Sequence, residues 1–519
     1  MISRPIRSFF WLLLSYWLLV PLDGLSQSAP SVPALIPASG LQQDVALLRA
    51  TFESLHPGLL RYQTQQQSAE SFDRLARDLN RDLSQRKVYV RLSAFTATLR
   101  CGHTYPNFFN QSDSVKHDLF DTSDRLPFFF RWIDGRMIVI KDFTPQHSLP
   151  QGTTVLSING MATGTVLRKL MPYARSDGHN DFKRVDYLQV VGVETYEATD
   201  LLAPMIFQDW HGPFRLVVQK PGAHLQKEQI VVAAVSAEER KREALQAHPD
   251  LSGTDPLFTL SVLQDGTAVL KMPTWAVFNT KWDWSAWLNN ALDQIADRHA
   301  PSLIVDLRGN EGGNDVGDLI LNRIRNSSVA PPTGYATLIR YRKVPDEFLP
   351  YLSTWDKRFR NRGTAAIELD KPWPTAPPVH YFELKEEPDQ PADAPSVATK
   401  PYVGKVLILA DASVSSATFN FSRIVQQEHL GTLIGEPTGG NRRGINGGSF
   451  FFLRLPNSGL EIDLPLVGTF PTEYQADEGL IPEVVVRVSR ENIAEGIDSV
   501  LNRALLLSGQ ERSIETKNR

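Results

Sequence analysis

The sequence predicts an α/β protein with a layered core, because a buried strand, a tight turn and a helix follow one another twice. In the first unit, the aliphatic run Ser302–Leu307 leads through the glycine-rich turn Arg308–Asn314 into a helical pattern. In the second unit, Lys405–Ala410 leads through the small, polar turn Asp411–Ser415 into another helix. Alternation of this kind favours helices packed on a parallel sheet.

Composition excludes several classes of protein. The chain has 519 residues with 22% charged residues and a net charge of −4, which gives no support for nucleic-acid binding. Its length suits about three domains. Cys101 is the only cysteine, so an intrachain disulfide is impossible. The histidines are scattered without a His-Glu-x-x-His motif, and we expect no metal and no cofactor.

The first 28 residues read as a secretory signal peptide. Arg4 and Arg7 precede the apolar run Phe9–Val20, which is short for a membrane span, and small residues follow near Ser26. An uncleaved N-terminal anchor is the alternative. An export signal without disulfides favours a bacterial periplasm or cell envelope, or secretion, with no stable membrane span after the signal is removed.

We expect residues 29–118 to form a helical domain, since Leu41–Leu99 has helix formers at amphipathic spacing. Residues 119–235 change to short strands, at 127–132, 137–140, 154–158, 214–218 and 229–233. Within them, Leu149–Gly160 (LPQGTTVLSING) precedes a helix at Thr165–Met171. That order resembles a PDZ domain, in which a chain end pairs with a sheet edge beside the helix. A generic β-rich insertion is the alternative.

We expect the α/β core to occupy residues 236–509, with a tail at 510–519. The core pattern includes a hairpin at 257–272, an amphipathic helix at 283–298, a hairpin at 449–464 and one final helix at 492–507. Residues 370–401 are rich in proline and predict an irregular surface excursion.

Ser416 follows the turn that begins at Asp411, at the predicted N-terminus of a helix. Unpaired N–H groups and the helix dipole favour negative charge there, which suits a nucleophile beside an oxyanion site. Ser413, Ser415 and Ser416 can equally be read as helix caps.

Three motifs together indicate one family. Asp306–Gly313 (DLRGNEGG) ends one strand, Ser416-Ala417 follows the next, and Gly435–Gly440 (GEPTGG) follows a third. Their order and spacing resemble the C-terminal-processing (tail-specific) serine peptidase family, including its tricorn-like members. The resemblance covers most of the chain after the signal peptide. It implies a crotonase- and ClpP-like β/α core behind a helical domain and a PDZ domain.

Carried over residue by residue, the resemblance implies Ser416 as the nucleophile, with Ser415 as the alternative one position away. Gly312 or Gly313, together with the N–H of Ala417, would form the oxyanion hole. Many family members use a lysine shortly after the Gly-Glu-x-Thr motif, but Asn441 stands at that position here.

The tricorn-like branch instead uses a histidine in a Gly-His-Thr motif, which here is Gly102-His103-Thr104. The resemblance therefore implies His103 as the general base. Glu478 matches the position of an orienting carboxylate, with Asp477 as the alternative.

Phe419 stands where many members have glutamate, which leaves a second function open. The leading interpretation is an exported serine endopeptidase that acts on peptides or proteins, with chain ends held by the PDZ-like domain. The alternative is a non-catalytic peptide-binding or scaffold protein of the same fold. An α/β-hydrolase esterase is disfavoured because the mature chain has no Gly-x-Ser-x-Gly elbow.

Overall fold

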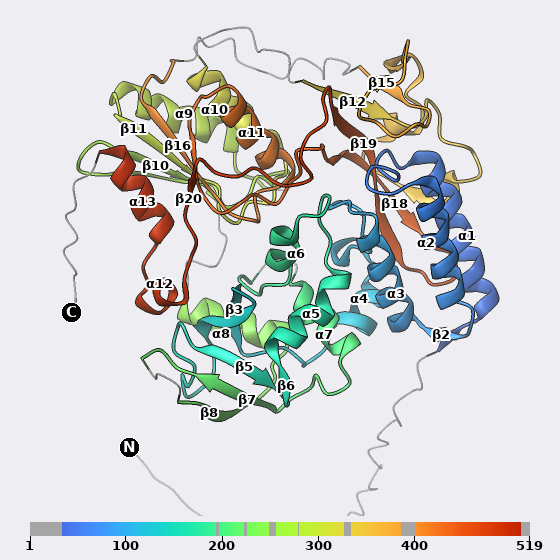
Figure 1. The fold of residues 1–519 in the computed structure, drawn as a ribbon, viewed down its shortest axis with the longest axis horizontal. Coiled ribbons are helices and arrows are strands. Elements are labelled where there is room, and N and C mark those ends of the chain that lie inside the picture. The colour runs from blue at the N-terminus through green and yellow to red at the C-terminus, as the bar shows by residue number, and fades with distance from the viewer. Residues whose placement is uncertain are drawn as a thin grey trace, which may run out of the picture. The chain divides into compact units, whose positions relative to one another are not determined.

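The computed structural model describes residues 34–193, 197–222, 226–248, 256–278, 280–325, 334–385 and 400–509 (Figure 1). The signal peptide expected at 1–28 and the tail expected at 510–519 lie outside the described residues. Among those described, no helix combines the length and the apolar character that crossing a membrane requires.

The N-terminal part is helical, as the amphipathic spacing predicts. Its elements are β1 (Leu35–Ile36), α1 (Ala38–Leu55), α2 (Gln65–Asp78), β2 (Leu83–Ser84), α3 (Gln85–Thr98), a 3₁₀ turn at Phe108–Asn110, and α4 (Asp113–Phe120). Thr64 begins α2 with a capping box, in which its hydroxyl accepts from the N–H of Gln67 while the Gln67 side chain accepts from the N–H of Thr64. The loop that carries His103 follows α3 directly.

A β-rich layer follows, close to the strands expected from alternation. Its strands are β3 (Phe128–Ile133), β4 (Arg136–Asp142), β5 (Thr154–Ile158), β6 (Met161–Ala162), β7 (Phe214–Gln219) and β8 (Glu228–Val232). They pair in the order β3-β4-β5-β7-β8, with β6 on β5. The outer edge of β3 is already bridged, because Phe130 and Val190 exchange two backbone hydrogen bonds.

Helices accompany this layer. They are α5 (Thr163–Leu170), a 3₁₀ turn at Met171–Tyr173, α6 (Asp181–Tyr187), α7 (Ala198–Ile206) and α8 (Ala237–Ala247). Asn180 caps α6 by accepting from the N–H of Lys183. As Figure 1 shows, α6 lies on the side of this layer that faces the loops of the core sheet.

The core sheet has six strands in the order β20-β17-β16-β11-β10-β9. Their bounds are β9 (Thr259–Val262), β10 (Ala268–Lys271), β11 (Ser302–Asp306), β16 (Lys405–Ala410), β17 (Thr432–Gly435) and β20 (Val484–Val485). All neighbours are parallel except the β9–β10 hairpin. The α/β core expected from the two strand–turn–helix units is therefore confirmed.

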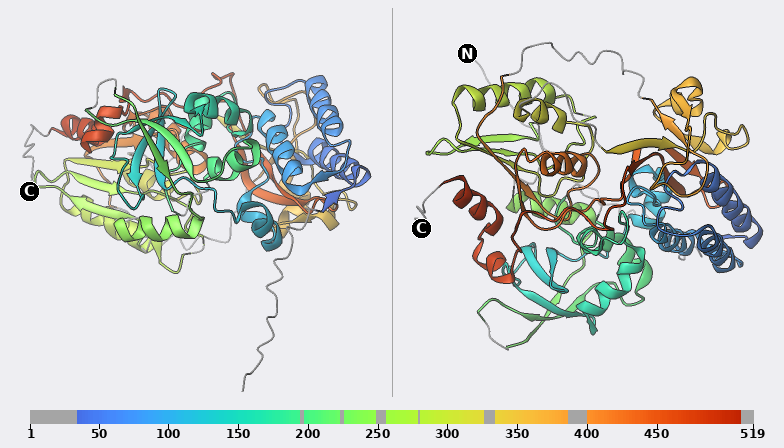
Figure 2. Two further views of the ribbon diagram at one scale, coloured as in Figure 1. Left: turned by 90° about the horizontal axis from the view of Figure 1, so that it is seen from below. Right: turned by 45° about the horizontal axis from the view of Figure 1, so that its top comes forward.

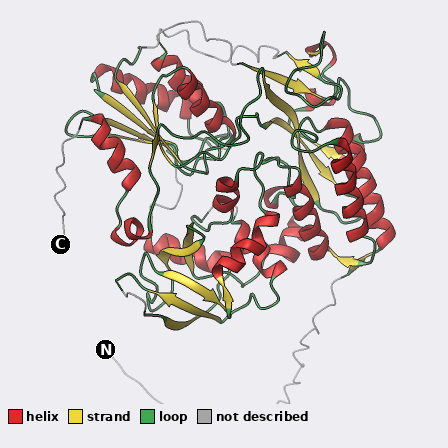
Figure 3. Ribbon diagram, viewed as in Figure 1, coloured by secondary structure: helices red, strands yellow, loops and turns green. Residues whose placement is uncertain are grey.

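Helices cover both faces of the core sheet (Figure 3). On one face, α9 (Trp284–Asp297), α10 (Gly317–Ile324) and α11 (Ser416–Gln427) pack on Leu303, Val305 and Ile408. On the other, α13 (Ser499–Ser508) packs through Val500 and Ala504 on Ile304 and Leu407. Strands buried on both faces explain why these segments are continuous aliphatic runs in the sequence.

The strand order brings the three motifs together. Because β11, β16 and β17 are parallel neighbours, the loops that follow them leave the same edge of the sheet. The turn before Ser416 stands in the middle, between the glycine loop after β11 and the Gly435–Gly440 loop after β17. These loops meet at the centre of the view in Figure 1.

A second six-stranded sheet was not foreseen from the sequence. Its antiparallel order is β13-β18-β19-β12-β15-β14. Its strands are β12 (Tyr335–Ile339), β13 (Leu352–Ser353), β14 (Ala366–Glu368), β15 (Phe382–Leu384), β18 (Asn446–Arg454) and β19 (Glu461–Pro471), with 3₁₀ turns at Leu349–Tyr351, Lys357–Arg360 and Gly363–Ala365. The long β18–β19 hairpin, expected at 449–464, is its centre and is seen from two further directions in Figure 2.

Two expectations need correction. Residues 370–385, the described start of the proline-rich range, are not wholly irregular, since they contain β15, and the Tyr381 ring packs on Phe470. The expected single helix at 492–507 is two helices, α12 (Arg490–Glu495) and α13. Gly496 adopts a left-handed conformation (φ 66°) that ends α12, and Asp498 caps α13.

Candidate active site

Ser416 stands at the junction of β16 and α11 in a conformation that few residues with a side chain adopt. Its φ is +54°, whereas the preceding Ser415 is extended with φ −145°. A left-handed backbone costs a residue with a Cβ roughly 1–2 kcal/mol. Strain of this kind occurs at functional sites, and a serine on a strained strand-to-helix turn is a known way to present a nucleophile.

Gly312 packs directly against Ser416. A Cβ atom on Gly312 would lie 2.8 Å from the Cβ of Ser416 and 2.9 Å from the backbone nitrogen of Ala417. Gly312 also has a φ of +95°, which favours glycine. The glycine loop and the start of α11 therefore touch through their backbones, as the sequence-based expectation for an oxyanion site requires.

The two candidate glycines of the oxyanion hole differ. The N–H of Gly312 donates to Oδ1 of Asn310 at 2.9 Å, so it is already engaged. Trp275 donates its N–H to the Gly312 carbonyl and accepts from the N–H of Asn314. These two hydrogen bonds join Trp275 to the residues on either side of Gly313. In a parallel bridge of this kind, the N–H of Gly313 itself points away from Trp275. Ala417 lies in the first turn of α11, where backbone N–H groups have no partner within the helix.

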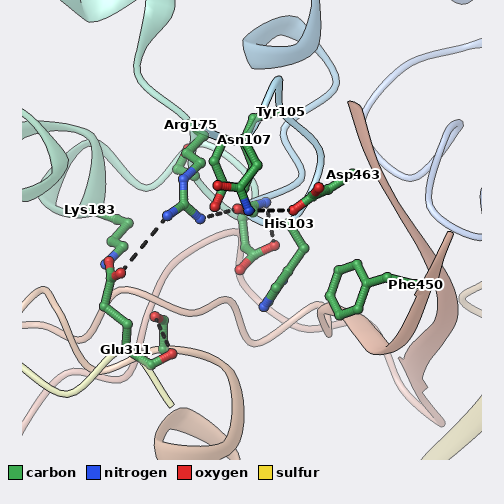
Figure 4. A pocket seen from close by; sticks show the side chains of 12 residues that line it. His103, Tyr105, Asn107, Arg175, Lys183, Glu311, Phe450 and Asp463 are labelled. Atoms are coloured by element: carbon green, nitrogen blue, oxygen red, sulfur yellow. Dashed lines mark hydrogen bonds and ion pairs between the residues drawn. The ribbon is translucent and has the colours of Figure 1, made fainter. Parts of the chain in front are cut away.

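His103 lines a cavity of about 240 Å³ beside these loops (Figure 4). Arg175, Lys183, Glu311, Ser415, Phe450 and Asp463 also line it. His103 and Ser415 thus come from segments more than 300 positions apart and meet in one cavity. Ser416 does not itself line this cavity, but it is flanked by two lining residues: Ser415 precedes it, and Glu311 precedes Gly312, which packs against it.

The environment of His103 keeps its imidazole neutral. Burial lowers its pKa below the ordinary value of 6.5; Asp177 acts to raise the pKa, and Arg175 lowers it further. Among the described residues, Nδ1 of His103 is buried without a hydrogen-bond partner. A neutral imidazole is the form that can accept a proton from a hydroxyl group.

Charged side chains also line the cavity. The side chain of Lys183 is 5% exposed, and its Nζ lies 2.5 Å from Oε1 of Glu311. Burial favours a neutral Lys183, but the charges of Glu311 and Asp186 outweigh it and raise the pKa. For Glu311, burial acts to raise the pKa, yet Lys183 and Arg175 dominate and lower it to about 2. The pair is therefore ionised at neutral pH.

Ser415, the alternative nucleophile, directs its hydroxyl into the turn. Its Oγ donates to the carbonyl of Ser413 at 3.0 Å and lies 3.4 Å from the carbonyl of Glu311. Its carbonyl accepts from the hydroxyl of Thr418 at 2.7 Å. These contacts describe a residue that stabilises the turn.

The structure does not bring Glu478 to His103. Its carboxylate lies 3.6 Å from Arg442 with both side chains more than 40% exposed, because the N–H of Arg442 binds the Glu478 carbonyl and the side chain is directed outward. Asp477 is also engaged elsewhere, 2.7 Å from Nδ1 of His179. Two other carboxylates act on His103, since Asp177 raises its pKa most and Glu311 raises it less. Asp177 is buried and accepts from the N–H of Gly102 at 2.9 Å.

The two departures from the family pattern have structural explanations. Asn441, at the usual lysine position, is fully buried and donates to the Asp177 carbonyl and to Asp477. Phe419 is 1% exposed and leaves no room for a side chain on Gly440, since a Cβ there would lie 2.3 Å from the ring. Both side chains are buried beside the site, and neither lines the cavity.

Asp177, Arg175 and Lys183 were missed by the sequence interpretation. They belong to one stretch, 175–186, that has no glycine motif and no catalytic signature. The only sequence signal was a run of polar residues between two apolar segments, which is typical of a loop. Within the described ranges, no three His, Cys, Asp or Glu side chains are placed to bind a metal ion.

Comparison with known proteins finds similarity in sequence and in fold. Residues 266–466 match the model of peptidase family S41. No curated protein matches the chain. Among solved structures, mature CPAF complexed with lactacystin aligns with a TM-score of 0.59 at 14% identity, covering 91% of this chain and 99% of CPAF. Mature CPAF alone gives a TM-score of 0.57 at 15% identity, covering 92% and 99%.

The structural likeness shows a shared fold over nearly the whole of both chains. The family match spans β10, β11, β16 and β17, together with the glycine loop and Ser416. Residues 266–466 are therefore similar in sequence to peptidase family S41, and the chain is a serine-type peptidase.

Proposed function

We propose that the protein hydrolyses peptide bonds with Ser416 as nucleophile and His103 as general base. The observation that carries this proposal is the strained Ser416, held at the start of α11 against Gly312. Of the two candidate serines it is the one whose backbone is forced into an unusual conformation. Ser415 has an ordinary extended backbone and a hydroxyl that is engaged within the turn.

In the proposed reaction the Ser416 hydroxyl attacks the peptide carbonyl while Nε2 of the neutral His103 takes its proton. The N–H groups of Gly313 and Ala417 stabilise the negative charge that develops on the carbonyl oxygen. His103 then returns the proton to the leaving amine, and water releases the acyl group from Ser416 by the reverse sequence. Asp177 replaces Glu478 in this proposal as the carboxylate that stabilises the charged imidazole.

A serine–lysine pair is the competing mechanism. Lys183 is the lysine of the cavity, but it is held by Glu311 and Asp186, which favour its charged form. A protonated ammonium has no lone pair with which to accept the serine proton. This supports the serine–histidine assignment.

Export to the periplasm or cell envelope is part of the proposal and rests on the sequence of residues 1–28. Capture of chain ends by the β-rich layer is also proposed. A peptide that added to the β3 edge would compete with Val190 for the backbone of Phe130. The remaining edge of that sheet is β8.

The test is hydrolysis of an unfolded protein substrate by the purified chain without residues 1–28, with Ser416→Ala, Ser415→Ala and His103→Ala in parallel. The proposal expects loss of activity for the first and third, and retention for Ser415→Ala. A folded wild-type protein that binds peptides but cleaves none would support a scaffold role. Loss of activity in Ser415→Ala alone would move the nucleophile by one residue.

A further inference from the structure

The stretch 175–186, which includes all of α6 except its last residue, contacts every loop of the candidate site. Toward the His103 loop, the guanidinium of Arg175 donates to the Gly102 carbonyl, and Asp177 accepts from the Gly102 N–H. Toward the loop after β17, the Asn180 side-chain amide donates to the carbonyls of Thr438 and Gly440 at 2.8 and 2.9 Å. The remaining two loops are held by Lys183 and Asp186.

Lys183 lies between the glycine loop and the nucleophile turn. Its Nζ is 2.5 Å from Glu311, the residue before Gly312, and 3.4 Å from the carbonyl of Ser413. Asp186 reinforces the second contact, because the Ser413 hydroxyl donates to its carboxylate at 2.9 Å. Figure 4 shows Lys183 reaching toward Glu311 from the helix, on the opposite side of Glu311 from His103.

From this placement we propose that Lys183 is a positioning residue, which holds the glycine loop and the nucleophile turn in register so that Gly313, Ala417 and Ser416 face one carbonyl group. The inference rests on the proposed function. Lys183 contacts neither of the reacting side chains; it acts through Glu311 and Ser413.

The physical reason lies in the tight contact of the two loops. Gly312 touches Ser416 so closely that a shift of either loop changes the relation between the nucleophile and the oxyanion donors. Displacements of about 1 Å can cost about a hundredfold in rate. The buried ammonium of Lys183 also lies between two carboxylates, those of Glu311 and Asp186, and offsets their mutual repulsion.

The decisive variants are Lys183→Met, whose unbranched side chain is one atom shorter and carries no charge, and Lys183→Arg, which keeps the charge. Arg240→Met is the matched control, because Arg240 forms a buried ion pair with Asp200, with side chains 6% and 5% exposed, away from the site. Glu311→Gln is a second variant that tests the same contact from the other loop. Each variant is assayed for kcat, KM, rate of labelling by a fluorophosphonate, and free energy of unfolding.

We expect Lys183→Met to lower kcat and the labelling rate by about a hundredfold while KM changes little. Lys183→Arg should recover much of the loss, and Glu311→Gln should lower kcat in the same way. Arg240→Met should lower stability yet leave the kcat of the folded enzyme unchanged.

Wild-type kcat in Lys183→Met and Glu311→Gln would overturn the inference while leaving the proposed function intact. The inference would also be overturned if Lys183→Arg were as inactive as Lys183→Met and the acidic limb of the pH profile were abolished. That result would make Lys183 the base. Absence of labelling in the wild-type protein would instead contradict the proposed function itself.

Discussion

A Cβ atom on Gly312 would lie 2.8 Å from the Cβ of Ser416, so the backbone of the glycine loop and the candidate nucleophile are in direct contact. Real Cβ atoms essentially never approach so closely, and the atoms that this Cβ would meet belong to Ser415, Ser416 and Ala417, where α11 begins. The glycine loop and the start of the helix are thus closely packed, and single substitutions can test this contact.

Replacing Gly312 should therefore abolish most of the activity. In Gly312→Ala the new methyl group forces the loop away from Ser416 and Ala417, and we expect kcat to fall by about 10²–10³, the effect of losing an oxyanion donor. Gly309→Ala is the control, since Gly309 has a similar φ of +82° but nothing within 4 Å of a new Cβ. Steady-state kinetics of the two variants decides the matter, and equal losses in both would contradict the proposed contact.

The strain at Ser416 predicts an unusual order of stabilities. Glycine adopts a φ of +54° without steric cost, so Ser416→Gly should be more stable than Ser416→Ala by about 0.5–1 kcal/mol. At Ser415, whose φ is −145°, the order should reverse, because glycine only adds freedom to the unfolded chain. Urea unfolding of the four variants measures this. The same order at both positions would mean that Ser416 is not strained.

The pH dependence of hydrolysis should report the environment of His103. Because burial lowers the pKa of His103, the acidic limb of kcat/KM should have its midpoint below 6.5. Asp177 raises that pKa, so Asp177→Asn should move the limb to still lower pH, while its side-chain oxygen can still accept from Gly102. Asp118→Asn removes an exposed charge as a control. If the acidic limb of kcat/KM lay at the same pH in Asp177→Asn as in the wild type, Asp177 would be excluded as the carboxylate that acts on His103.

His56 should make the protein sensitive to acid. Burial, with Arg340 and Arg61, lowers its pKa from 6.5 to about 3. Nδ1 of His56 accepts from the N–H of Gly58, so Nε2 carries the proton and donates to the hydroxyl of Thr104, next to His103. As pH falls from 6.5 toward 3, the unfolded state gains a proton that the folded state does not, and stability decreases.

The variant His56→Gln removes this proton uptake. Its free energy of unfolding should therefore fall less steeply between pH 6.5 and 3, by up to about 1.4 kcal/mol per pH unit. Urea unfolding at several pH values gives the two slopes. Parallel slopes for wild type and variant would contradict the assignment.

Several elements could be predicted from the sequence because their signals are local. The strands at 154–158 and 405–410 have the predicted bounds, since short aliphatic runs between turn residues specify buried strands. The helix that begins at Ser416 follows from the polar turn before it. The meeting of the three loops also follows, because parallel strands end at one edge of a sheet.

Other features depend on contacts between distant segments. Lys183 and Glu311 are 128 positions apart, and nothing near either residue indicates the partner. The orienting carboxylate was expected at Glu478 from its place beside a motif, whereas its side chain is directed outward toward Arg442. The second sheet was missed because strands such as β13 and β14 have only two and three residues.

The most direct measurement of the central claim is to label the wild-type protein with a fluorophosphonate and locate the adduct by peptide mass spectrometry. We expect one modified residue, Ser416, and no adduct in His103→Ala over the same time. An adduct on Ser415, or an adduct on Ser416 that forms equally fast without His103, would contradict it.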